Sequence, residues 1–515
     1  MNLIDVIGKF ARMSPHAPAF VEVRPVTGAR EEISWAGFDE RTSRLARGLI
    51  DRGAAKGRKV FLLGKNSLNW LEAYFAILKT GAWAVPLNFR FTDNDIRYCA
   101  KIAEPSIFIF DGEYGSRIAA LRGELPTVGA YLCIGGSAAE GVETLEDVVR
   151  ASHPSVNVRL EDEDECALYF TSGTTGMAKP VLLQHKALMC TALTEANNNG
   201  FVCSDSLLMM PPLYHLAIGH LLGAMAAGAC TVLLTEQINP RNIVETVSRE
   251  RISVVFLLVP WAADLIEAFD GKTLRMEDYD FTRWRYIFMG AQPIPPSLVQ
   301  RIKRYFPAMR YDTTYGLSES SGPGVIHLGM DNERKIGAIG KPGLMWDARL
   351  VDDEGRDVPS GEIGEVIVRG AGVMKEYYKN PELTASVIRD GWLHTGDLGR
   401  ADEEGFIYLV DRKKDLIISG GENVYPVEVE EVIRKHAGVH DVAVIGTPDD
   451  RLGEIVTVVI QAKSGEVLRE EEIKRFCEEQ LPRYKRPRRI IFGEVPRNPS
   501  GKIEKPKLRE LYRPG

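Results

Sequence analysis

Short apolar runs alternate with longer helical patterns through most of the chain. Residues 70–78 have the apolar spacing of a helix, and continuous apolar runs typical of buried strands span residues 60–63, 81–87, 106–110, 231–234 and 254–259. Strands that are apolar on both faces are typical of parallel sheets that helices cover on both sides. The pattern therefore predicts an α/β fold whose large N-terminal domain is built from parallel sheets.

The pattern changes after residue 340. Apolar and polar residues alternate between Gly and Asp turns in residues 348–355 and 364–370, which predicts a β-rich, barrel-like subdomain. Beyond Asp411 we expect a small, mobile α+β domain, with helices over 427–436 and 470–479 and strands over 442–446 and 455–460. Five consecutive charged residues, 411–415, are expected to be exposed. They set the predicted domain boundary, with residues 1–411 on one side and 412–515 on the other.

Composition places the chain among globular proteins and leaves open the role of a basic C-terminal segment. The 515 residues are 44% hydrophobic and 26% charged, with a net charge of −7 that argues against a nucleic-acid partner. Residues 481–515, however, hold eleven Lys and Arg against three Glu, a net charge of +8. Such a basic tail could meet a polyanionic small molecule, a membrane surface or nucleic acid, or it could be a solvated face.

Cysteine usage and hydropathy predict a cytoplasmic protein. The seven cysteines are scattered and form no CxxC pair, as expected for reduced thiols, and this argues against a zinc cluster. No apolar run approaches the ~18 residues of a membrane span, so stable membrane insertion is not expected. The first residues also lack the basic region of a signal peptide.

The stretch from Tyr169 to Lys179 reads Tyr-Phe-Thr-Ser-Gly-Thr-Thr-Gly-Met-Ala-Lys. Glycines that permit close backbone approach, together with hydroxyls and a cation, suit a loop that surrounds phosphate oxygens. Gly173 and Gly176 are too close together for a Walker loop, and no Gly-Lys pair follows. The alternative is a surface turn rich in Ser, Thr and Gly.

Further motifs follow in order, each ambiguous by itself. In residues 315–319 an aromatic ring could stack on a base and a carboxylate could hold magnesium, or the segment is a turn with a buried Tyr. Asp397 could accept hydrogen bonds from ribose, or form an Asx turn. Asp411-Arg412 could extend that contact, or be a surface ion pair. The glycines of residues 417–426 suit close backbone approach, and residues 211–215 suit core packing.

Taken together, these motifs resemble the adenylate-forming superfamily, which includes acyl-CoA synthetases, aryl-CoA ligases, luciferases and peptide-synthetase adenylation domains. The resemblance covers nearly the whole chain and includes Gly501-Lys502 near the end. It implies that the protein uses ATP and coenzyme A as co-substrates and Mg²⁺ as a cofactor. Its further partner would be a small carboxylic acid. The resemblance leaves the oligomeric state open, and a homodimer is one of the alternatives.

The resemblance also implies roles for individual residues. ATP or AMP would contact Thr171, Ser172, Gly173, Thr174, Thr175, Lys179, Ala291, Thr313, Thr314, Tyr315, Ser318, Asp397 and Arg412. Glu319 would hold magnesium, Lys502 would be the catalytic lysine, Lys414 the hinge, and Gly420 and Gly421 would border the coenzyme A tunnel. The acyl pocket would draw on His215, Leu216, Ala217, Gly290, Gly316, Ser321 and Gly322.

The expected reaction makes an acyl-adenylate and pyrophosphate from the acid and ATP, then an acyl-CoA and AMP. The acyl residues include no obvious charged partner, which favours a medium-chain, alicyclic or aromatic acid. No acid stands in the motif Pro212-Leu213-Tyr214-His215, where amino-acid-activating relatives usually carry Asp. Three departures from the family pattern are the loop ending Ala178-Lys179-Pro180, Thr313 in place of Asn or Gln, and Ser318 in place of Thr.

Two alternatives remain at this point. A fatty-acyl-AMP ligase or a luciferase-like enzyme would share the adenylating chemistry but not the release of a coenzyme A thioester. A non-catalytic nucleotide- or nucleic-acid-binding protein would use the basic tail and would lack acid-dependent turnover.

Overall fold

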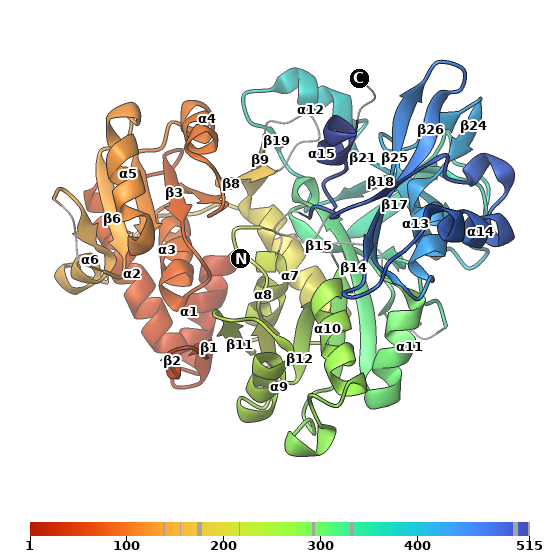
Figure 1. The fold of residues 1–515 in the computed structure, drawn as a ribbon. Coiled ribbons are helices and arrows are strands. Elements are labelled where there is room, and N and C mark those ends of the chain that lie inside the picture. The colour runs from red at the N-terminus through yellow and green to blue at the C-terminus, as the bar shows by residue number, and fades with distance from the viewer. Residues whose placement is uncertain are drawn as a thin grey trace.

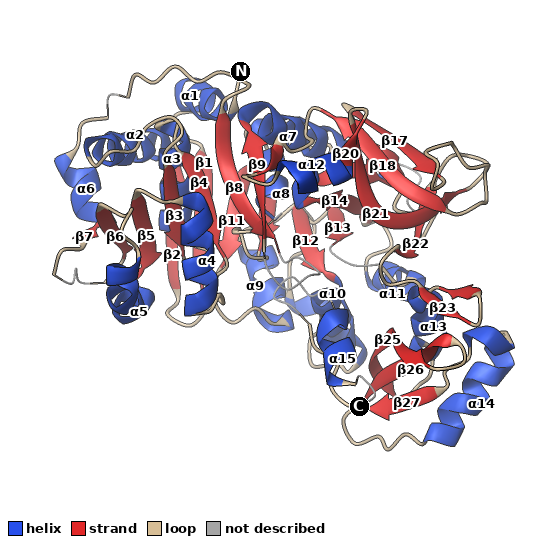
Figure 2. Ribbon diagram, turned by 90° about the horizontal axis from the view of Figure 1, so that it is seen from above, coloured by secondary structure: helices blue, strands red, loops and turns tan. Residues whose placement is uncertain are grey.

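The computed structural model describes residues 1–136, 140–154, 156–171, 178–215, 217–290, 294–329, 334–497 and 503–512. Two large sheets make up most of the N-terminal region, and a smaller unit lies at one corner of the molecule (Figure 1, Figure 2). None of the helices in the described part of the chain has the length and apolar character needed to span a bilayer.

The first sheet has eight strands in the order β19-β9-β8-β4-β3-β5-β6-β7. The strands from β8 to β7 in this order pair in parallel. At the β8 edge, β9 and then β19 extend the sheet with antiparallel pairing. The strands are β3 (Lys59–Leu63), β4 (Trp83–Leu87), β5 (Ile107–Asp111), β6 (Ala130–Ile134), β7 (Glu143–Thr144), β8 (Glu165–Thr171), β9 (Lys179–Gln184) and β19 (Glu376–Tyr377).

The second sheet has nine strands in the order β16-β15-β14-β13-β12-β10-β11-β1-β2. Its centre is parallel, and antiparallel strands close both edges. The strands are β1 (Pro18–Arg24), β2 (Ala29–Ser34), β10 (Ser206–Met209), β11 (Cys230–Leu234), β12 (Val254–Leu258), β13 (Tyr286–Gly290), β14 (Arg310–Leu317), β15 (Gly322–His327) and β16 (Lys341–Pro342).

Helices cover both faces of both sheets. Between the sheets lie α1 (Leu3–Met13), α2 (Trp35–Asp51), α3 (Leu68–Lys79), α6 (Leu145–Ala151), α7 (His185–Asn199) and α8 (Ala217–Ala226). The outer face of the first sheet carries α4 (Asp93–Ala103) and α5 (Gly115–Leu121), and that of the second carries α9 (Pro240–Arg249), α10 (Val259–Asp270) and α11 (Pro296–Tyr305).

This layering explains why the predicted strands are apolar throughout. In β12, Val254, Phe256 and Leu258 belong to the core between the sheets, whereas Val255 and Leu257 belong to the outer core. Successive side chains of a strand point to opposite faces, so a strand covered on both sides has no position for a polar residue. The parallel-sheet prediction is confirmed, with Val259 as a small correction because it begins α10.

The β-rich region is an antiparallel sheet, which confirms that part of the prediction. It contains β17 (Trp346–Val351), β18 (Gly364–Gly370), β20 (Ile388–Arg389), β21 (Trp392–Ala401) and β22 (Ile407–Arg412), and α12 (Pro381–Val387) lies beside it. The C-terminal unit contains β23 (Ile417–Ser419), β24 (Glu422–Val424), β25 (Val439–Asp449), β26 (Gly453–Ala462), β27 (Arg489–Phe492), α13 (Pro426–Arg434), α14 (Glu470–Gln480) and α15 (Lys505–Leu511).

The charged segment 411–415 is not uniformly exposed, contrary to the prediction. Asp411 and Asp415 are buried, because each has polar partners in the C-terminal unit. Asp411 Oδ2 accepts a 3.0 Å hydrogen bond from the N–H of Val427, in the first turn of α13. Arg509 of α15 lies 2.7 Å from Asp415 Oδ1. The junction is therefore a packed, hydrogen-bonded contact.

The basic tail also has internal partners. Lys485 pairs with Glu428, Arg497 with Asp441 at 2.7 Å, Lys505 with Glu430 at 2.9 Å, and Arg509 with Asp415. These pairs use four of the basic side chains to hold the C-terminal unit together. They favour the interpretation of the tail as part of the fold.

Candidate active site

Tyr315, Asp397 and Arg412 meet although they come from three separate motifs. The Tyr315 hydroxyl donates to Asp397 Oδ2 at 2.6 Å, and Arg412 Nε lies 2.7 Å from Asp397 Oδ1. Antiparallel pairing places Asp397 of β21 directly opposite Arg412 of β22. Tyr315 and Asp397 are buried, while the Arg412 side chain is 38% exposed. The ion pair is thus half-enclosed, with one cationic group open to solvent.

A second cluster contains Glu319, Tyr377 and Lys179. The Tyr377 hydroxyl donates to Glu319 Oε1 at 2.6 Å, and Lys179 Nζ lies 5.2 Å from the centre of the Tyr377 ring. The pairing of β19 with β9, which sets Tyr377 opposite Val181, brings the ring to this place. Sequence reasoning missed Tyr377, because nothing near it distinguishes it from Tyr378 and the contact depends on a strand far earlier in the chain.

Electrostatics connects the two clusters. The pKa of Arg412 is raised, chiefly by Asp397 against the opposing effect of burial, with further contributions from Tyr315, Asp415 and Glu319. Burial and the nearby Glu319 carboxylate raise the pKa of Tyr377, so its hydroxyl stays protonated and able to donate. The cationic guanidinium of Arg412 therefore lies in the field of both carboxylates, which links the two clusters electrostatically.

The ends of the predicted phosphate loop are paired. Thr171 ends β8, Lys179 begins β9, and the two are cross-strand partners. The loop residues Ser172, Gly173, Thr174 and Thr175 lie outside the described residues, as do Ala291, Leu216 and Lys502. The Tyr98 hydroxyl donates to the carbonyl of Ala178 at 3.1 Å, which holds the second arm of the loop against α4.

The nucleotide residues predicted on β14 lie at the carboxyl ends of parallel strands. Thr313 pairs with Met289 of β13, and Thr313, Thr314 and Ser318 are all buried. Open α/β sheets bind their ligands at this edge. A Cβ at Gly290 would lie only 3.1 Å from the carbonyl oxygen of Thr314, so the two strand ends approach closely.

The predicted acyl residues of the 316–322 turn are close-packed. A Cβ at Gly316 would lie 1.9 Å from the carbonyl oxygen of Gly322, so no other residue fits there. Ser321 adopts a φ of 62°, and its hydroxyl donates to the carbonyl of Gly372 at 2.6 Å. The structure therefore brings Gly316, Ser321 and Gly322 together in one turn.

His215 and Ala217 lie at the start of α8. The His215 N–H donates to the carbonyl of Pro212 at 3.3 Å, and its ring lies 6.4 Å from that of Tyr214. Leu213 and Tyr214 are buried, in agreement with the core-packing alternative for this segment. His215 itself is half-buried, and Ala217 is the first residue of the helix.

The predicted hinge and coenzyme A residues follow β22. Burial and the neighbouring Arg412 lower the pKa of Lys414 to about 8. Gly420 and Gly421 form the two-residue turn between β23 and β24, with φ values of 62° and 86°. A two-residue hairpin turn with both φ values positive favours glycine. The turn geometry by itself therefore accounts for glycine at these two positions.

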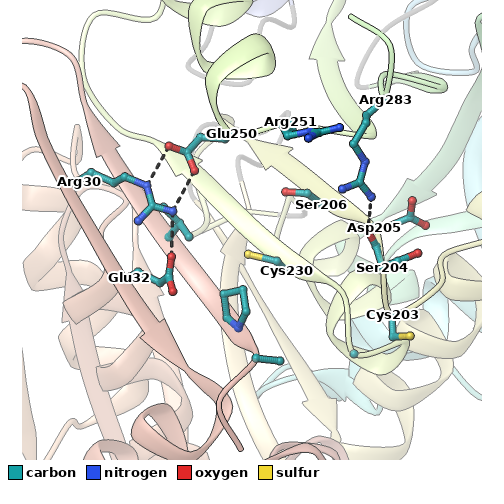
Figure 3. A pocket seen from close by; sticks show the side chains of 14 residues that line it. Arg30, Glu32, Cys203, Ser204, Asp205, Ser206, Cys230, Glu250, Arg251 and Arg283 are labelled. Carbon is teal, nitrogen blue, oxygen red and sulfur yellow. Dashed lines mark hydrogen bonds and ion pairs between the residues drawn. The ribbon is translucent and has the colours of Figure 1, made fainter. Parts of the chain in front are cut away.

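A separate cavity of about 230 Å³ lies near β1, β2 and β10 (Figure 3). Among the charged residues that line it, Arg30 pairs with Glu32 and Glu250, and Arg283 donates to the carbonyl of Ser204. Of the predicted site residues that the structure describes, none lines this cavity.

Comparison with known proteins identifies the class. Residues 8–378 match the AMP-binding enzyme family, and residues 428–502 match the AMP-binding enzyme C-terminal domain. The chain therefore belongs to the AMP-binding enzyme family.

Particular relatives are CoA ligases. The chain is 33% identical to the long-chain-fatty-acid–CoA ligase FadD13 of Mycobacterium tuberculosis, over 99% of this chain and 98% of that protein. It is 34% identical to a feruloyl-CoA synthase of an Amycolatopsis species, over 98% and 97% of the two chains. The crystal structure of the anthranilate CoA ligase AuaEII in complex with anthranoyl-AMP has a TM-score of 0.89 and 26% identity, covering 100% of this chain and 97% of that one.

Proposed function

We propose that the protein is an ATP-dependent acid–CoA ligase that works through an acyl-adenylate. The observation that carries the proposal is the convergence of Tyr315, Asp397 and Arg412 beside Glu319 and Lys179. Four segments of the chain supply these five groups, and each group would have a use in binding a nucleotide. The similarity to CoA ligases over nearly the whole chain supports the same reaction.

Asp397 and Arg412 would hold the ribose. A carboxylate that already accepts from Tyr315 and Arg412 has lone pairs left for hydroxyl donors, and its partners fix its orientation. Thr313, Thr314 and Tyr315 would line the adenine at the strand ends, and Ser318 would contact the α-phosphate. The loop from Thr171 to Lys179 would surround the β- and γ-phosphates.

Glu319 is the residue that would hold magnesium. The described residues contain no group of three or more His, Cys, Asp or Glu side chains suited to a metal ion. That fits Mg²⁺, which is often bound by one or two carboxylates together with substrate phosphates. When bound, the ion would offset the repulsion between the anionic acid and the anionic phosphates. The hydrogen bond from Tyr377 to Glu319 Oε1 would fix the orientation of this carboxylate and leave it further lone pairs for the ion.

Lys502 would stabilise charge at the α-phosphate while the acid attacks and pyrophosphate leaves. Rotation about Lys414 would then withdraw Lys502 and bring Gly420 and Gly421 toward the site for coenzyme A. The thiol attacks the acyl carbonyl, the acyl–phosphate bond breaks, and AMP leaves. The chain needs no side-chain nucleophile for either step.

The acid itself is proposed from the acyl residues and the relatives. Gly290, Gly316, Ser321 and Gly322 are all small residues, and small residues around an acyl pocket would leave room for a ring or a medium-length chain. The relatives named above act on fatty, ferulic and anthranilic acids by their names. We propose a medium-chain, alicyclic or aromatic acid.

Pyrophosphate release across a panel of aliphatic, alicyclic and aromatic acids tests the proposal. We expect acid-dependent pyrophosphate release, and AMP release that requires coenzyme A. Pyrophosphate release without any CoA thioester would identify an acyl-AMP ligase or a luciferase-like enzyme instead. No acid-dependent turnover would overturn the adenylating function.

A further inference from the structure

An ionisable pair lies buried between α7 and α8. His220 Nδ1 is 2.6 Å from Glu195 Oε2, and the side chains keep only 4% and 0% of their exposure. Asn199 Nδ2 also donates to Glu195 Oε2, at 3.0 Å. Burying a charged or polar pair is costly, and apolar residues of similar volume often serve the fold as well. Neither the phosphate chemistry nor the hinge uses this pair.

The pair lies beside the proposed acyl residues. Position 220 lies three residues after the predicted acyl position 217 on α8. The His220 ring packs on Phe256 at 4.1 Å between centroids, and the Phe256 ring edge is 3.9 Å from where a Cβ of Gly290 would lie. These contacts connect Gly290 at the strand ends with Glu195 deeper in the layer between the sheets.

Glu195 also borders the turn that carries the other acyl residues. A Cβ at Gly324 would lie 2.6 Å from Glu195 Oε1, and one at Gly219 would lie 2.5 Å from Pro323. Gly324 and Pro323 directly follow Gly322 on β15. The carboxylate is therefore close to the backbone that forms one wall of the proposed pocket.

This polar cluster has more acceptors than donors. Glu195 Oε1, Asn198 Oδ1 and Asn199 Oδ1 are buried without a hydrogen-bond partner in the part of the chain that the structure describes. Each is an acceptor, so each would be satisfied by an O–H or N–H group. Buried polar atoms are nearly always paired in native proteins, so these three acceptors require a donor, which either a bound ligand or a buried water supplies.

We propose that the His220–Glu195 pair is a specificity-determining element that selects acids carrying a hydroxyl or amino group at the end remote from the carboxylate. This inference rests on the proposed acid–CoA ligase function. In the tautomer whose Nδ1–H donates to Glu195, Nε2 of the His220 ring is left as a further acceptor. The adjacent rings of His220 and Phe256 suit a flat, aromatic acid.

The test compares three matched acids, the 4-hydroxy, 4-amino and 4-methyl forms of one arylalkenoic or benzoic acid. The methyl group has nearly the size of the hydroxyl but cannot donate. For the wild-type protein we expect kcat/KM for pyrophosphate release to be at least about tenfold higher with a donor-bearing acid, because a site built to bind a donor rejects an analogue without one. His220→Phe and the double variant His220→Phe, Glu195→Leu should reduce that preference to about twofold or less.

Controls separate the possible outcomes. Asn197→Ala, an exposed position on the same helix, should leave the preference unchanged. The double variant removes the unpaired carboxylate, so it remains informative where His220→Phe alone folds poorly. Calorimetric binding of the same acids to the ATP-loaded protein gives a readout independent of turnover. Equal preference in the wild type, as expected where a buried water satisfies the acceptors, would overturn the inference, and so would a preference that the variants retain. Inactivity with every acid would instead count against the proposed function.

Discussion

The hydroxyl of Tyr377 donates a 2.6 Å hydrogen bond to Glu319 Oε1. The two residues come from different sheets: Glu319 follows β14 of the nine-stranded sheet, and Tyr377 lies on the edge strand of the eight-stranded sheet. The backbone N–H of Met374 also donates to the carbonyl of Glu319, at 2.8 Å. The segment 374–377 therefore fixes Glu319 at the line where the two sheets meet, which is where the phosphates are proposed to bind.

Replacing Tyr377 with Phe removes this hydrogen bond and keeps the ring. We expect kcat/KM for ATP to fall about tenfold, since a hydrogen bond to a charged group contributes about 1.5–3 kcal/mol and the carboxylate proposed to hold magnesium would lose its orientation. Tyr378→Phe is the matched control, because its ring packs on Trp83 away from Glu319. Steady-state pyrophosphate release at varied ATP and Mg²⁺ measures both. Equal kinetics for the two variants would contradict the role given to Tyr377.

Asp397→Asn tests the ribose contact. The amide leaves Arg412 without its ion-pair partner at 2.7 Å, so we expect the KM for ATP to rise roughly 10- to 100-fold. We also expect a loss of about 1–3 kcal/mol in the free energy of unfolding, because Asp397 is buried. Asp353→Asn removes the exposed partner of Lys413 and should change neither quantity measurably. An unchanged KM for Asp397→Asn would remove it from the nucleotide site.

Local chemistry in the sequence was sufficient to predict the buried strands and to single out several residues that the structure brings together. Periodicity found the parallel strands because each is covered on both faces, as the alternation of Val254 and Val255 between two cores illustrates. Asp397 and Arg412 were singled out because the family resemblance implies a shared role for them, and the structure places them in contact. Tyr377 and the His220–Glu195 pair were missed because their positions depend on strand pairing and helix packing between distant segments. The burial of Asp411 and Asp415 was likewise unpredictable, since their partners Val427 and Arg509 come later in the chain.

Gly316→Ala tests how closely the 316–322 turn is packed. The added Cβ would lie 1.9 Å from the carbonyl oxygen of Gly322, so the backbone must shift. We expect a loss of at least about 2 kcal/mol in unfolding free energy, or loss of adenylation in a protein that still folds. Gly115→Ala in α5 is the matched control: no atom lies within 4 Å of its Cβ position and its φ is −54°. Thermal unfolding and pyrophosphate release measure both variants. A Gly316→Ala protein with wild-type stability and activity would show that the turn can open.

Lys502→Ala should reduce acyl-adenylate formation by about 10²–10³-fold, as for the loss of one preorganised donor to developing charge. We expect thioester formation from supplied acyl-adenylate and coenzyme A to be much less affected, because Lys502 is proposed to leave the site for that step. Lys507→Ala, which is exposed and lies in the same basic tail, is the charge-matched control. Comparable losses in both half-reactions would contradict a role limited to adenylation.

Asp411 gives the folded protein a predictable dependence on pH. Burial raises its pKa from 3.8 to about 6, against the opposing effects of Lys505 and of the N–H groups of Val427 and Arg412. Between those two pH values the folded protein retains a proton that the unfolded chain has released. The free energy of unfolding therefore falls as pH rises from about 4 to about 6, by up to about 3 kcal/mol from this residue.

Asp411→Asn should remove that dependence, because the amide does not titrate and its oxygen can still accept from Val427. We expect the variant to gain stability relative to the wild type as pH rises from about 4 to about 6, with a constant difference above that range. Asp111→Asn is the matched comparison, since burial raises the pKa of Asp111 to about 6 as well, far from the domain junction. Both variants should flatten the stability profile, but only Asp411→Asn should also change how readily a protease cleaves the junction 411–427. Urea unfolding and limited proteolysis at pH 4.5, 5.5, 6.5 and 7.5 measure the two effects. A profile for Asp411→Asn that stays parallel to that of the wild type would mean that Asp411 is ionised throughout this range.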